Sequence, residues 1–440
     1  MSNTLTHIDN KPSLRASHCE DEGRRNLKQS HPLFPALRFN EFEGEWNKCL
    51  LGNISEKVGS GSTPSGGNQV YQDTGIPFIR SQNVTGNKLV LDETHISETI
   101  NNKMKGSIVK PHDILLNITG GSIGRTCVVP SDFDIGNVNQ HVCIIRLKSD
   151  YTPRFLQPFL ASHKGQKLLY QGMTGSGREG INFQSIRLFK LNLPSLPEQQ
   201  KIASFLSAVD EKIQQLTKKK ALLEQYKKGL MHELFSGQLR FKDENGNPYP
   251  DWEDAVMQDV FERVKEKNKE NNLNVMSISA QQGLVNQLEY FKRYVSAADV
   301  TGYYLLQKGD FAYNKSYSKG YPMGAIKRLD RYDKGVVSTL YICFRIKEND
   351  DSTFYKEFLD HGGINSELHK IAQEGARNHG LLNMSVIEFF RDIKIPRPSV
   401  EEQIVVGKFL EDLSVKIESV KEELTQTQTF KKGLLQQMFV

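Results

Sequence analysis

The sequence predicts an α+β protein with a pseudo-two-fold internal repeat, in which two β-rich globular domains are separated by two long coiled-coil helices. Residues 198–235 form the longest helical pattern in the chain, and residues 402–439 repeat it without a gap. Each copy follows a stretch of short β-type runs separated by turn residues. A chain of 440 residues is too long for one ordinary core, so the repeat predicts where two domains lie.

Apolar residues recur along both helical copies at alternating spacings of four and three residues. The first seam consists of Ile202, Leu206, Val209, Ile213, Leu216, Lys220, Leu223, Lys227, Leu230 and Leu234. The second consists of Val406, Leu410, Leu413, Ile417, Val420, Leu424, Thr427, Lys431, Leu434 and Met438. Sustained spacing of this kind is typical of a coiled coil. Each helix therefore needs a partner, and the other copy is the obvious one.

Composition bounds the class of protein. With 38% hydrophobic residues, 25% charged residues and no long apolar run, we expect a soluble globular protein without a membrane span. Residues 1–35 are polar and lack the apolar segment of a secretory signal, so we expect a disordered N-terminal extension. The five cysteines show no C-x-x-C pair, which disfavours a zinc site or a disulfide framework and fits a cytoplasmic location. A net charge of +5 permits nucleic-acid binding without requiring it.

Short β-type runs bounded by Gly, Pro, Asn or Asp fill both globular stretches. We expect strands at 76–81, 113–119, 126–130 and 141–147 in the first stretch, and at 275–279, 310–314 and 340–346 in the second. Helices are expected after the last strand of each stretch, at 155–171 and 354–373.

The two globular stretches also match each other faintly. The paired segments are Asp113–Asn117 with Asp310–Asn314, His141–Arg146 with Leu340–Arg345, and the entry segments Leu37–Phe39 and Trp46 with Leu239–Phe241 and Trp252. Loops between the matches differ in length while the scaffold is shared. Such a pattern indicates that the two copies have the same kind of function but act on two different targets.

The sequence contains neither a G-x-x-x-x-G-K-[ST] phosphate loop nor an Asn-Pro-Pro-aromatic run of the kind that amino-methyltransferases use. The glycine-rich segment 59–67 lacks the lysine that would reach a phosphate, so it does not predict a nucleotide site. The segment 243–251 imitates a calcium loop, but Pro248 occupies the place where glycine is needed for the sharp turn. We interpret this segment as a linker turn.

The order of these features resembles the specificity subunits of type I restriction-modification systems. The resemblance rests on the entry segment, the β-rich domain, the run Leu-Pro-Ser-Leu-Pro-Glu-Gln-Gln at 193–200, the helix ending Lys-Lys-Gly-Leu-Met, and the repetition of this unit. It covers residues 36–440. The second copy departs from it, because its second proline lies further ahead of Glu402 and Gly407 replaces Ala203. The exact start of the second helix is therefore open.

This resemblance implies a recognition subunit that is not an enzyme. Target-recognition domains are expected at 36–192 and 238–394, and spacer helices at 193–237 and 395–440. Each domain would read one half of a bipartite site in double-stranded DNA. The paired helices would set the gap and dock two methyltransferase subunits, to which motor-nuclease subunits attach. S-adenosylmethionine, ATP and magnesium would then belong to the partner subunits, and this chain would hold no cofactor or metal.

Base readout needs Arg or Lys for guanine and Asn or Gln for adenine, while small polar groups contact phosphates. In the first half the candidate DNA-binding residues are Ser60, Ser62, Thr63, Arg80, Gln82, Asn83, Thr119, Ser122, Arg125 and Arg178. In the second half they are Gln281, Gln282, Asn314, Lys315, Ser316, Tyr317, Ser318, Lys319, Arg377, Asn378 and His379. For each residue the alternative is a solvated loop side chain, and the aligned Asn117 and Asn314 could instead brace turns.

We hypothesise that the two helices pack antiparallel, so that the half-sites lie about one turn of DNA apart. Two other classes stay open at this point. One is a coiled-coil scaffold for protein interactions without DNA readout, which the polar loops disfavour. The other is a single-chain enzyme, which the missing motifs disfavour.

Overall fold

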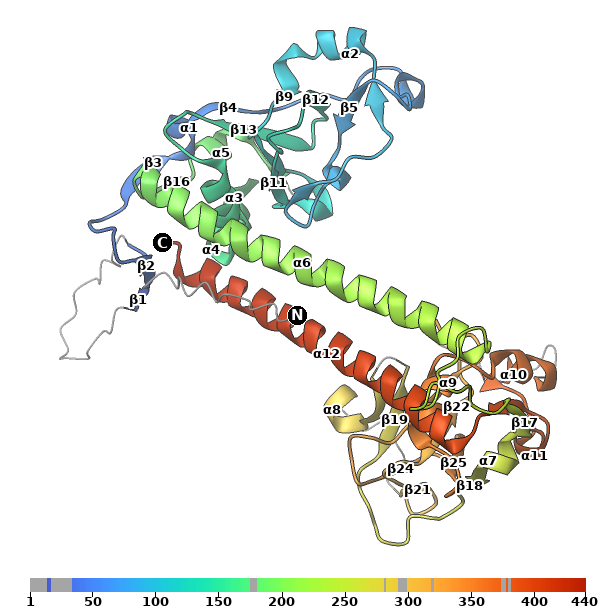
Figure 1. Cartoon of the computed structure of the whole chain (residues 1–440). Coiled ribbons are helices and arrows are strands. Elements are labelled where there is room, and N and C mark those ends of the chain that lie inside the picture. The colour runs from blue at the N-terminus through green and yellow to red at the C-terminus, as the bar shows by residue number, and fades with distance from the viewer. Residues whose placement is uncertain are drawn as a thin grey trace, which may run out of the picture. The chain divides into compact units, whose positions relative to one another are not determined.

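The computed structural model describes residues 14–16, 34–174, 180–280, 282–291, 299–317, 320–372, 377–378 and 381–440 (Figure 1). Its contacts divide the chain into two units, residues 1–215 with 423–440 and residues 216–422. Each unit therefore contains one β-rich body together with parts of both long helices. Among the described helices, none combines the length and apolarity needed to cross a bilayer.

Both predicted long helices are present as α6 (Leu196–Phe235) and α12 (Val400–Gln437). Every predicted seam position on either helix is buried or half-buried. The carbonyl oxygens of Ser195 and Ser399 accept the backbone N–H of Gln199 and Gln403 at 2.9 Å, so the two helices begin at aligned positions. The displaced proline of the second copy thus leaves the start of its helix unchanged.

In the first unit, the two helix segments run in opposite directions. Lys431 of α12 pairs with Asp210 of α6. Further along α6, Lys212 lies 2.8 Å from the earlier α12 residue Glu423.

The second unit shows the same opposed course. Lys227 of α6 donates to the hydroxyl of Ser414 on α12 at 2.6 Å. About two turns further along α6, Leu234 belongs to the same hydrophobic cluster as Val406, which precedes Ser414 on α12. Within each unit the helix segments are therefore antiparallel.

A buried glutamate at the start of α6 ties the helix to the entry segment. The Glu198 carboxylate accepts hydrogen bonds from Arg38 Nε at 2.7 Å, Arg38 Nη2 at 2.8 Å and Trp46 Nε1 at 3.2 Å. The neighbouring Gln199 side chain accepts the N–H of Thr152, the residue before helix α3 (Pro153–Ala161), at 3.1 Å. The Glu-Gln pair thus joins the entry segment, the long helix and the globular body.

The second copy repeats these contacts with its own residues. Glu402 accepts from Arg240 Nη2 at 2.7 Å and from Trp252 Nε1 at 2.8 Å. Gln403 accepts the N–H of Asp351, which precedes helix α9 (Ser352–Asp360), at 2.7 Å. The Glu-Gln pair, which is common to both copies of the motif behind the family resemblance, therefore has a structural cause.

Helix α12 passes close to the start of α9 at Gly407. A Cβ atom added there would lie 2.7 Å from the backbone nitrogen of Phe354 and 2.8 Å from Oδ1 of Asp351. That oxygen caps α9 by accepting the N–H groups of Thr353 and Phe354. Glycine is therefore required here, whereas α6 carries Ala203 at the aligned position.

The chain enters and leaves each body through a pair of antiparallel strands. In the first unit β3 (Asn47–Leu50) pairs with β16 (Lys190–Leu193). In the second unit β17 (Glu253–Val256) pairs with β28 (Lys394–Arg397), and Val256 lies opposite Lys394. Each body is thus bounded by a two-strand neck.

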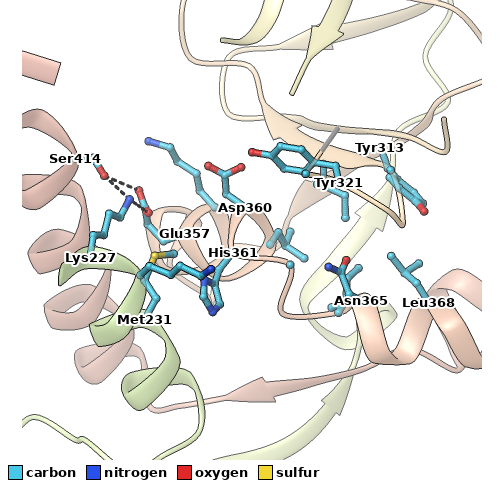
Figure 2. A pocket seen from close by; sticks show the side chains of 18 of the residues that line it. Lys227, Met231, Tyr313, Tyr321, Glu357, Asp360, His361, Asn365, Leu368 and Ser414 are labelled. Atoms are coloured by element: carbon cyan, nitrogen blue, oxygen red, sulfur yellow. Dashed lines mark hydrogen bonds and ion pairs between the residues drawn. The ribbon is translucent and has the colours of Figure 1, made fainter. Parts of the chain in front are cut away.

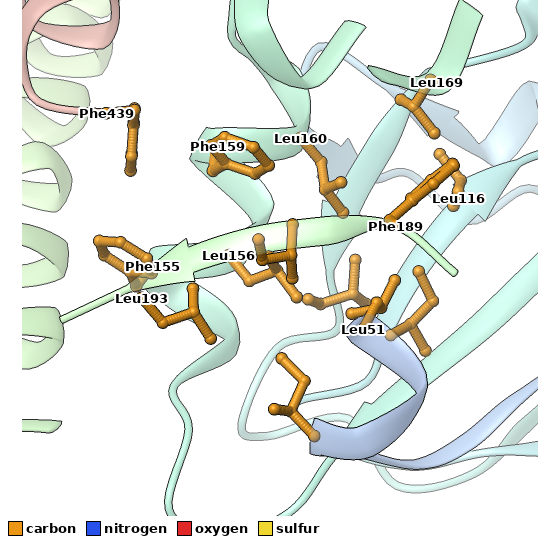
Figure 3. Packing of buried hydrophobic residues seen from close by; sticks show 14 of the residues in the cluster. Leu51, Leu116, Phe155, Leu156, Phe159, Leu160, Leu169, Phe189, Leu193 and Phe439 are labelled. Atoms are coloured by element: carbon orange, nitrogen blue, oxygen red, sulfur yellow. The ribbon is translucent and has the colours of Figure 1, made fainter. Parts of the chain in front are cut away.

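Two sheets form the first body. The first has the order β11-β10-β13-β4, with β4 (Ser55–Ser60), β10 (Ile114–Asn117), β11 (Thr126–Val128) and β13 (Val142–Leu147). The second has the order β8-β5-β12-β9, with β5 (Ile76–Ile79), β8 (His95–Ile96), β9 (Ile108–Val109) and β12 (Gly136–Val138). Figure 3 shows the core, where Phe155, Phe159 and Phe439 meet Leu156 and Leu160.

The second body has a four-stranded sheet of the order β18-β25-β22-β23. Its strands are β18 (Phe261–Arg263), β22 (Phe311–Asn314), β23 (Ala325–Arg328) and β25 (Ile342–Ile346). Two further pairs are β19 (Met276–Ser279) with β20 (Gly283–Asn286), and β21 (Tyr304–Gln307) with β24 (Lys334–Val337). The rings of Phe311 and Phe344 stack at 5.3 Å in its core.

Ion pairs between a partly exposed arginine and a buried aspartate confirm the faint matches between the two bodies. Arg146 Nη2 on β13 lies 2.7 Å from Asp113, just before β10. Arg345 Nε on β25 lies 2.6 Å from Asp310, just before β22. The matched segments therefore form the same hydrogen-bonded strand pair in each unit.

The single helices predicted at 155–171 and 354–373 are each wrong as continuous elements. The first is broken into α3 and α4 (His163–Gln171), because the Ser162 hydroxyl caps α4 by accepting the N–H of Gly165. The second is broken into α9 and α10 (Asn365–Ile371), because Gly362 adopts a positive φ of 83° between them.

Shorter elements complete the two units. They are β1 (Leu14–Ala16) paired with β2 (Leu37–Phe39), β6 (Val84–Thr85) paired with β7 (Lys88–Leu89), α1 (Leu51–Ile54), α2 (Glu98–Lys103), α5 (Phe183–Arg187), α7 (Met257–Val260), α8 (Gln287–Phe291) and α11 (Val386–Arg391). The rest of the predicted N-terminal extension before residue 34 lies outside the described residues.

Replacing Glu402 with alanine should destabilise the second unit by about 3–5 kcal/mol, because Arg240 and Trp252 lose a buried charged partner. Urea unfolding followed by Trp252 fluorescence, in a Trp46→Phe background, measures this loss. Glu401→Ala is the matched control, because Glu401 is exposed and its loss should cost less than about 0.5 kcal/mol. Equal losses in the two variants would contradict the role given to Glu402.

Candidate functional site

Three loops of the first unit gather at one end of the sheet β11-β10-β13-β4. The strand β13 lies between β10 and β4, and its first residue Val142 pairs with Asn117, the last residue of β10. The last residue of β4, Ser60, lies at the same end. The Thr63 hydroxyl reaches across to the side-chain oxygen of Gln140. The loops after β4 and β10 and the loop before β13 are therefore neighbours.

The candidates after β4 differ in exposure. Ser60 is half-buried and its hydroxyl donates to the carbonyl of Gly61 at 3.3 Å. Ser62 and Thr63 are exposed. The two exposed residues are better placed than Ser60 to meet a ligand.

The turn at 80–83 joins this group of loops because Asn117 Nδ2 donates to the carbonyl of Ser81 at 2.8 Å. Arg80 is partly exposed and Gln82 is exposed. Asn83 is 3% exposed, its Oδ1 accepts the N–H of Arg80, and its Nδ2 donates to Val90. Asn83 therefore braces the turn and presents no group to a base edge.

The loop after β10 carries Arg125, the most exposed of the cationic candidates whose side chains the structure describes. Thr119 Oγ1 lies 2.5 Å from His141 Nδ1, which fixes the start of the loop. Ser122 is half-buried and its carbonyl accepts the N–H of Arg125 at 3.1 Å. Arg125 is exposed and has no side-chain partner among the described residues. Gln166 of α4 donates to the carbonyl of Gly124 at 3.0 Å, which holds the loop against the helix.

A hairpin of β14 (Met173–Thr174) and β15 (Gly180–Ile181) lies against the same loop. The N–H of Ile181 donates to the carbonyl of Ile118 at 3.0 Å. Arg178, which lies between the two strands in sequence, is outside the described residues.

The second unit has an equivalent arrangement after β22. The N–H of Leu382 donates to the carbonyl of Lys315 at 3.1 Å, so a hairpin again lies against the loop. Asn314 braces this loop, because its Oδ1 accepts the N–H of Ser316 at 3.1 Å. Lys315 and Ser316 are half-buried, while Tyr317 is exposed.

The remaining candidates of the second unit are only partly described. Arg377 and Asn378 form β26 (Arg377–Asn378), which pairs with β27 (Leu381–Leu382), but their side chains are outside the described part. Gln282 is exposed in the turn between β19 and β20. The candidates wholly outside the described residues are Gln281, Ser318, Lys319 and His379.

Sequence reasoning missed three residues of this loop group. Gln140 contacts Thr63, His141 contacts Thr119, and Asp92 accepts hydrogen bonds from Arg80 and Gln82. The polar run Asn-Val-Asn-Gln-His directly before β13 could have indicated the first two. No pattern in the sequence singles out Asp92.

A cavity of about 680 Å³ lies in the second unit, beside the end of α6 (Figure 2). At its wall Lys227 hydrogen-bonds to Glu357 and Ser414, as the dashed lines show. Asp360 of the same wall pairs with Lys327. The acidic groups are thus held by lysines, and we interpret the cavity as part of the contact between helix and body. Among the described residues there is no cluster of His, Cys, Asp or Glu that could hold a metal ion.

Residues 43–225 match the family model of the type I restriction modification DNA specificity domain. The chain is 26% identical over 214 residues to the type I restriction enzyme EcoBI specificity subunit of Escherichia coli, a match that covers 46% of this chain and 44% of the relative. It is 27% identical over 199 residues to the HindI specificity subunit of Haemophilus influenzae, covering 43% and 41%. The matched regions span less than half the length of either relative.

The fold is also similar to that of a solved structure. The S subunit of a type I restriction-modification system from M. genitalium superposes with a TM-score of 0.57 at 16% identity, covering 92% of this chain and 99% of that chain. The family model thus matches the first part of the chain, and the likeness in fold extends over most of it. In these respects the chain is similar to the specificity subunits of type I restriction-modification systems.

The cavity in Figure 2 also predicts a pH effect at His361. Burial, His232, Lys228 and Lys227 lower the pKa of His361 below its ordinary value of 6.5. The unfolded chain then takes up the proton first, so the second unit should lose stability as pH falls below about 6.5 and gain nothing from this group at higher pH. His361→Asn should remove this part of the pH dependence in urea unfolding between pH 7.5 and 5.5.

The exposed His369 on α10 supplies the control. His369→Asn should retain the wild-type difference between the two pH values. If His361→Asn also retained it, the effect would have to come from other groups.

Proposed function

We propose that this chain reads a bipartite sequence in double-stranded DNA, with one half read by each unit. The observation that carries the proposal is an arrangement at the strand ends that is repeated in the two units. In both units a loop follows the central strand, a hairpin donates a backbone hydrogen bond to that loop, and an Asp-Arg pair holds the strands beneath it. The scaffold is shared, while the loops carry different residues.

Loop chemistry supports this proposal. The exposed groups Gln82, Arg125 and Gln282 are of the types that match base edges in the major groove, and exposed hydroxyls such as Ser62 suit phosphate contacts. A coiled-coil scaffold without DNA readout is not favoured, since the family match is to a DNA specificity domain.

We further infer that α6 and α12 form an antiparallel coiled-coil spacer that sets the gap between the half-sites. Support comes from the opposed course of the helix segments inside each unit and from the buried seams. At about 1.5 Å per residue, α6 with its 40 residues is about 60 Å long.

The spacer is also the proposed docking surface for two methyltransferase subunits, through which motor-nuclease subunits join. We assign adenine methylation, with S-adenosylmethionine, to the methyltransferases, and ATP- and magnesium-dependent cleavage to the motor-nuclease subunits. Recognition is then the contribution of this chain.

Exchanging residues 256–392 for those of another specificity subunit should change one half of the recognised sequence and leave the other half unchanged. The neck allows this exchange because the two cut points lie close together: Val256 pairs with Lys394, and the N–H of Met257 donates to the carbonyl of Ile393 at 3.0 Å. Sequencing of methylated DNA from cells that express the chimaera with its methyltransferase reports both halves. A change in both halves would contradict modular reading.

Arg125→Ala should weaken binding to the recognised sequence roughly tenfold. The loss should be smaller for DNA in which one base pair of one half-site has been changed, because Arg125 then has no matching base to contact. Competition binding with single-base variants of the site measures this dependence. Arg154→Ala is the control, because Arg154 is exposed at the start of α3 and away from the loops. A loss that is uniform across sequences would reassign Arg125 to a phosphate contact.

A further inference from the structure

Two predicted DNA-binding residues of the first unit share one carboxylate oxygen. Asp92 Oδ2 accepts a hydrogen bond from Arg80 Nη2 at 2.9 Å and another from Gln82 Nε2 at 2.6 Å. Its other oxygen, Oδ1, accepts the N–H of Thr94 at 3.0 Å, so the carboxylate is fixed to the backbone. Asp92 therefore connects two side chains that sequence analysis treated as independent.

The backbone around Asp92 is rigidly placed. Asn83 bonds to the backbone of residues on both sides of the β6–β7 hairpin, through Arg80 N–H and the Val90 carbonyl. Two residues after Asp92, the carbonyl of Thr94 accepts the N–H of Phe78 at 2.9 Å. The distance between Asp92 and the turn at 80–83 is thus set by the fold.

Arg80 has little freedom left for base readout. Its Nη2 donates to Asp92 and also to the Thr94 hydroxyl at 2.7 Å, which uses both hydrogens of that nitrogen. Its Nε is buried without a partner in the described structure. A paired contact with guanine needs Nη2 together with Nε or Nη1, so neither pair of N–H groups is complete, and only Nη1 keeps hydrogens for a single contact.

Gln82, in contrast to Arg80, keeps hydrogen-bonding groups available for DNA. Its side chain is exposed, and only one hydrogen of Nε2 is used by Asp92. An ionised carboxylate can only accept hydrogen bonds, so the amide nitrogen of Gln82 must face Asp92. The amide oxygen and the second N–H then remain available together. These are the two groups with which glutamine contacts adenine.

We propose that Gln82 is the base-reading residue of this turn and that Asp92 is a positioning residue that fixes the orientation of its amide. Arg80 then serves to neutralise Asp92 beside the DNA, while the N–H of Thr94 holds the carboxylate in place. The inference rests on the proposed function in DNA recognition, and it assigns different roles to three residues within it.

The ionisation of Asp92 agrees with these roles. Burial opposes the charged form, but hydrogen bonds from Thr94, Gln82 and Asn83 hold the pKa of Asp92 well below its usual range. The carboxylate therefore stays ionised at neutral pH and cannot donate. Asparagine at this position has nearly the same shape but offers both a donor and an acceptor, so it would let the Gln82 amide turn over.

The test compares Gln82→Ala, Asp92→Asn and Arg80→Ala with the wild-type full chain, each purified with its methyltransferase partner. Binding to DNA libraries with one half-site randomised gives the preference at every position. Gln82→Ala should lower the preference at one or two adjacent base pairs roughly tenfold and leave the other half-site unchanged. Asp92→Asn should relax the same base pairs. Arg80→Ala should weaken binding by the same factor for all sequences, so that no base preference changes.

Gln214→Ala is the matched control, since Gln214 is an exposed glutamine on α6 away from the loops. It should leave all preferences unchanged. If Asp92→Asn lowered only the melting temperature, or weakened binding equally at all positions, Asp92 would be merely structural and the inference would be overturned. Loss of base preference in Arg80→Ala but not in Gln82→Ala would overturn it as well. A wild-type complex without any base preference would instead overturn the proposed function itself.

Discussion

The rest of each unit depends on the buried glutamate at the start of its long helix. Glu198 and Glu402 each accept hydrogen bonds from one arginine and one tryptophan of the entry segment. A buried carboxylate without such partners would lower the free energy of unfolding by several kcal/mol. Separating the entry segment from the long helix would therefore destabilise the start of that helix. The following glutamine extends the same contact to the body. The direction of each helix relative to the body of its unit is therefore set locally, within a few residues.

Much of this fold could be predicted from the sequence, because its strongest signals are periodic. The seam of α6 and α12 gave the helices, and segments such as Asp113–Asn117 gave strands. The break at Ser162 was missed because a serine cap inside an apolar pattern looks like an ordinary helical position. At the candidate site, residue types indicated the loops, but the burial of Asn83 and the role of Asp92 depend on contacts across the hairpin, which no local pattern encodes.

The two units keep an interaction while changing the residues that make it. In the second unit Lys227 pairs with Glu357 from the body and with Ser414 from α12. In the first unit the aligned lysine, Lys431, pairs with Asp210, which takes the place of Ser414 along the helix. Pro158 of α3 occupies the position that Glu357 has in α9. The carboxylate that pairs with the lysine therefore comes from the body in the second unit and from the long helix in the first unit. Symmetry is thus retained in the ion pair and lost in the sequence.

Gly407 makes the two long helices unequal at one position. The helix that carries it fits against α9, where even a methyl group would collide with the backbone of Phe354. The aligned position of α6 carries Ala203, so the first unit has room for a methyl group where the second unit has none. An alanine-to-glycine change at this position of α6 is therefore sterically tolerated, whereas a glycine-to-alanine change in α12 is not.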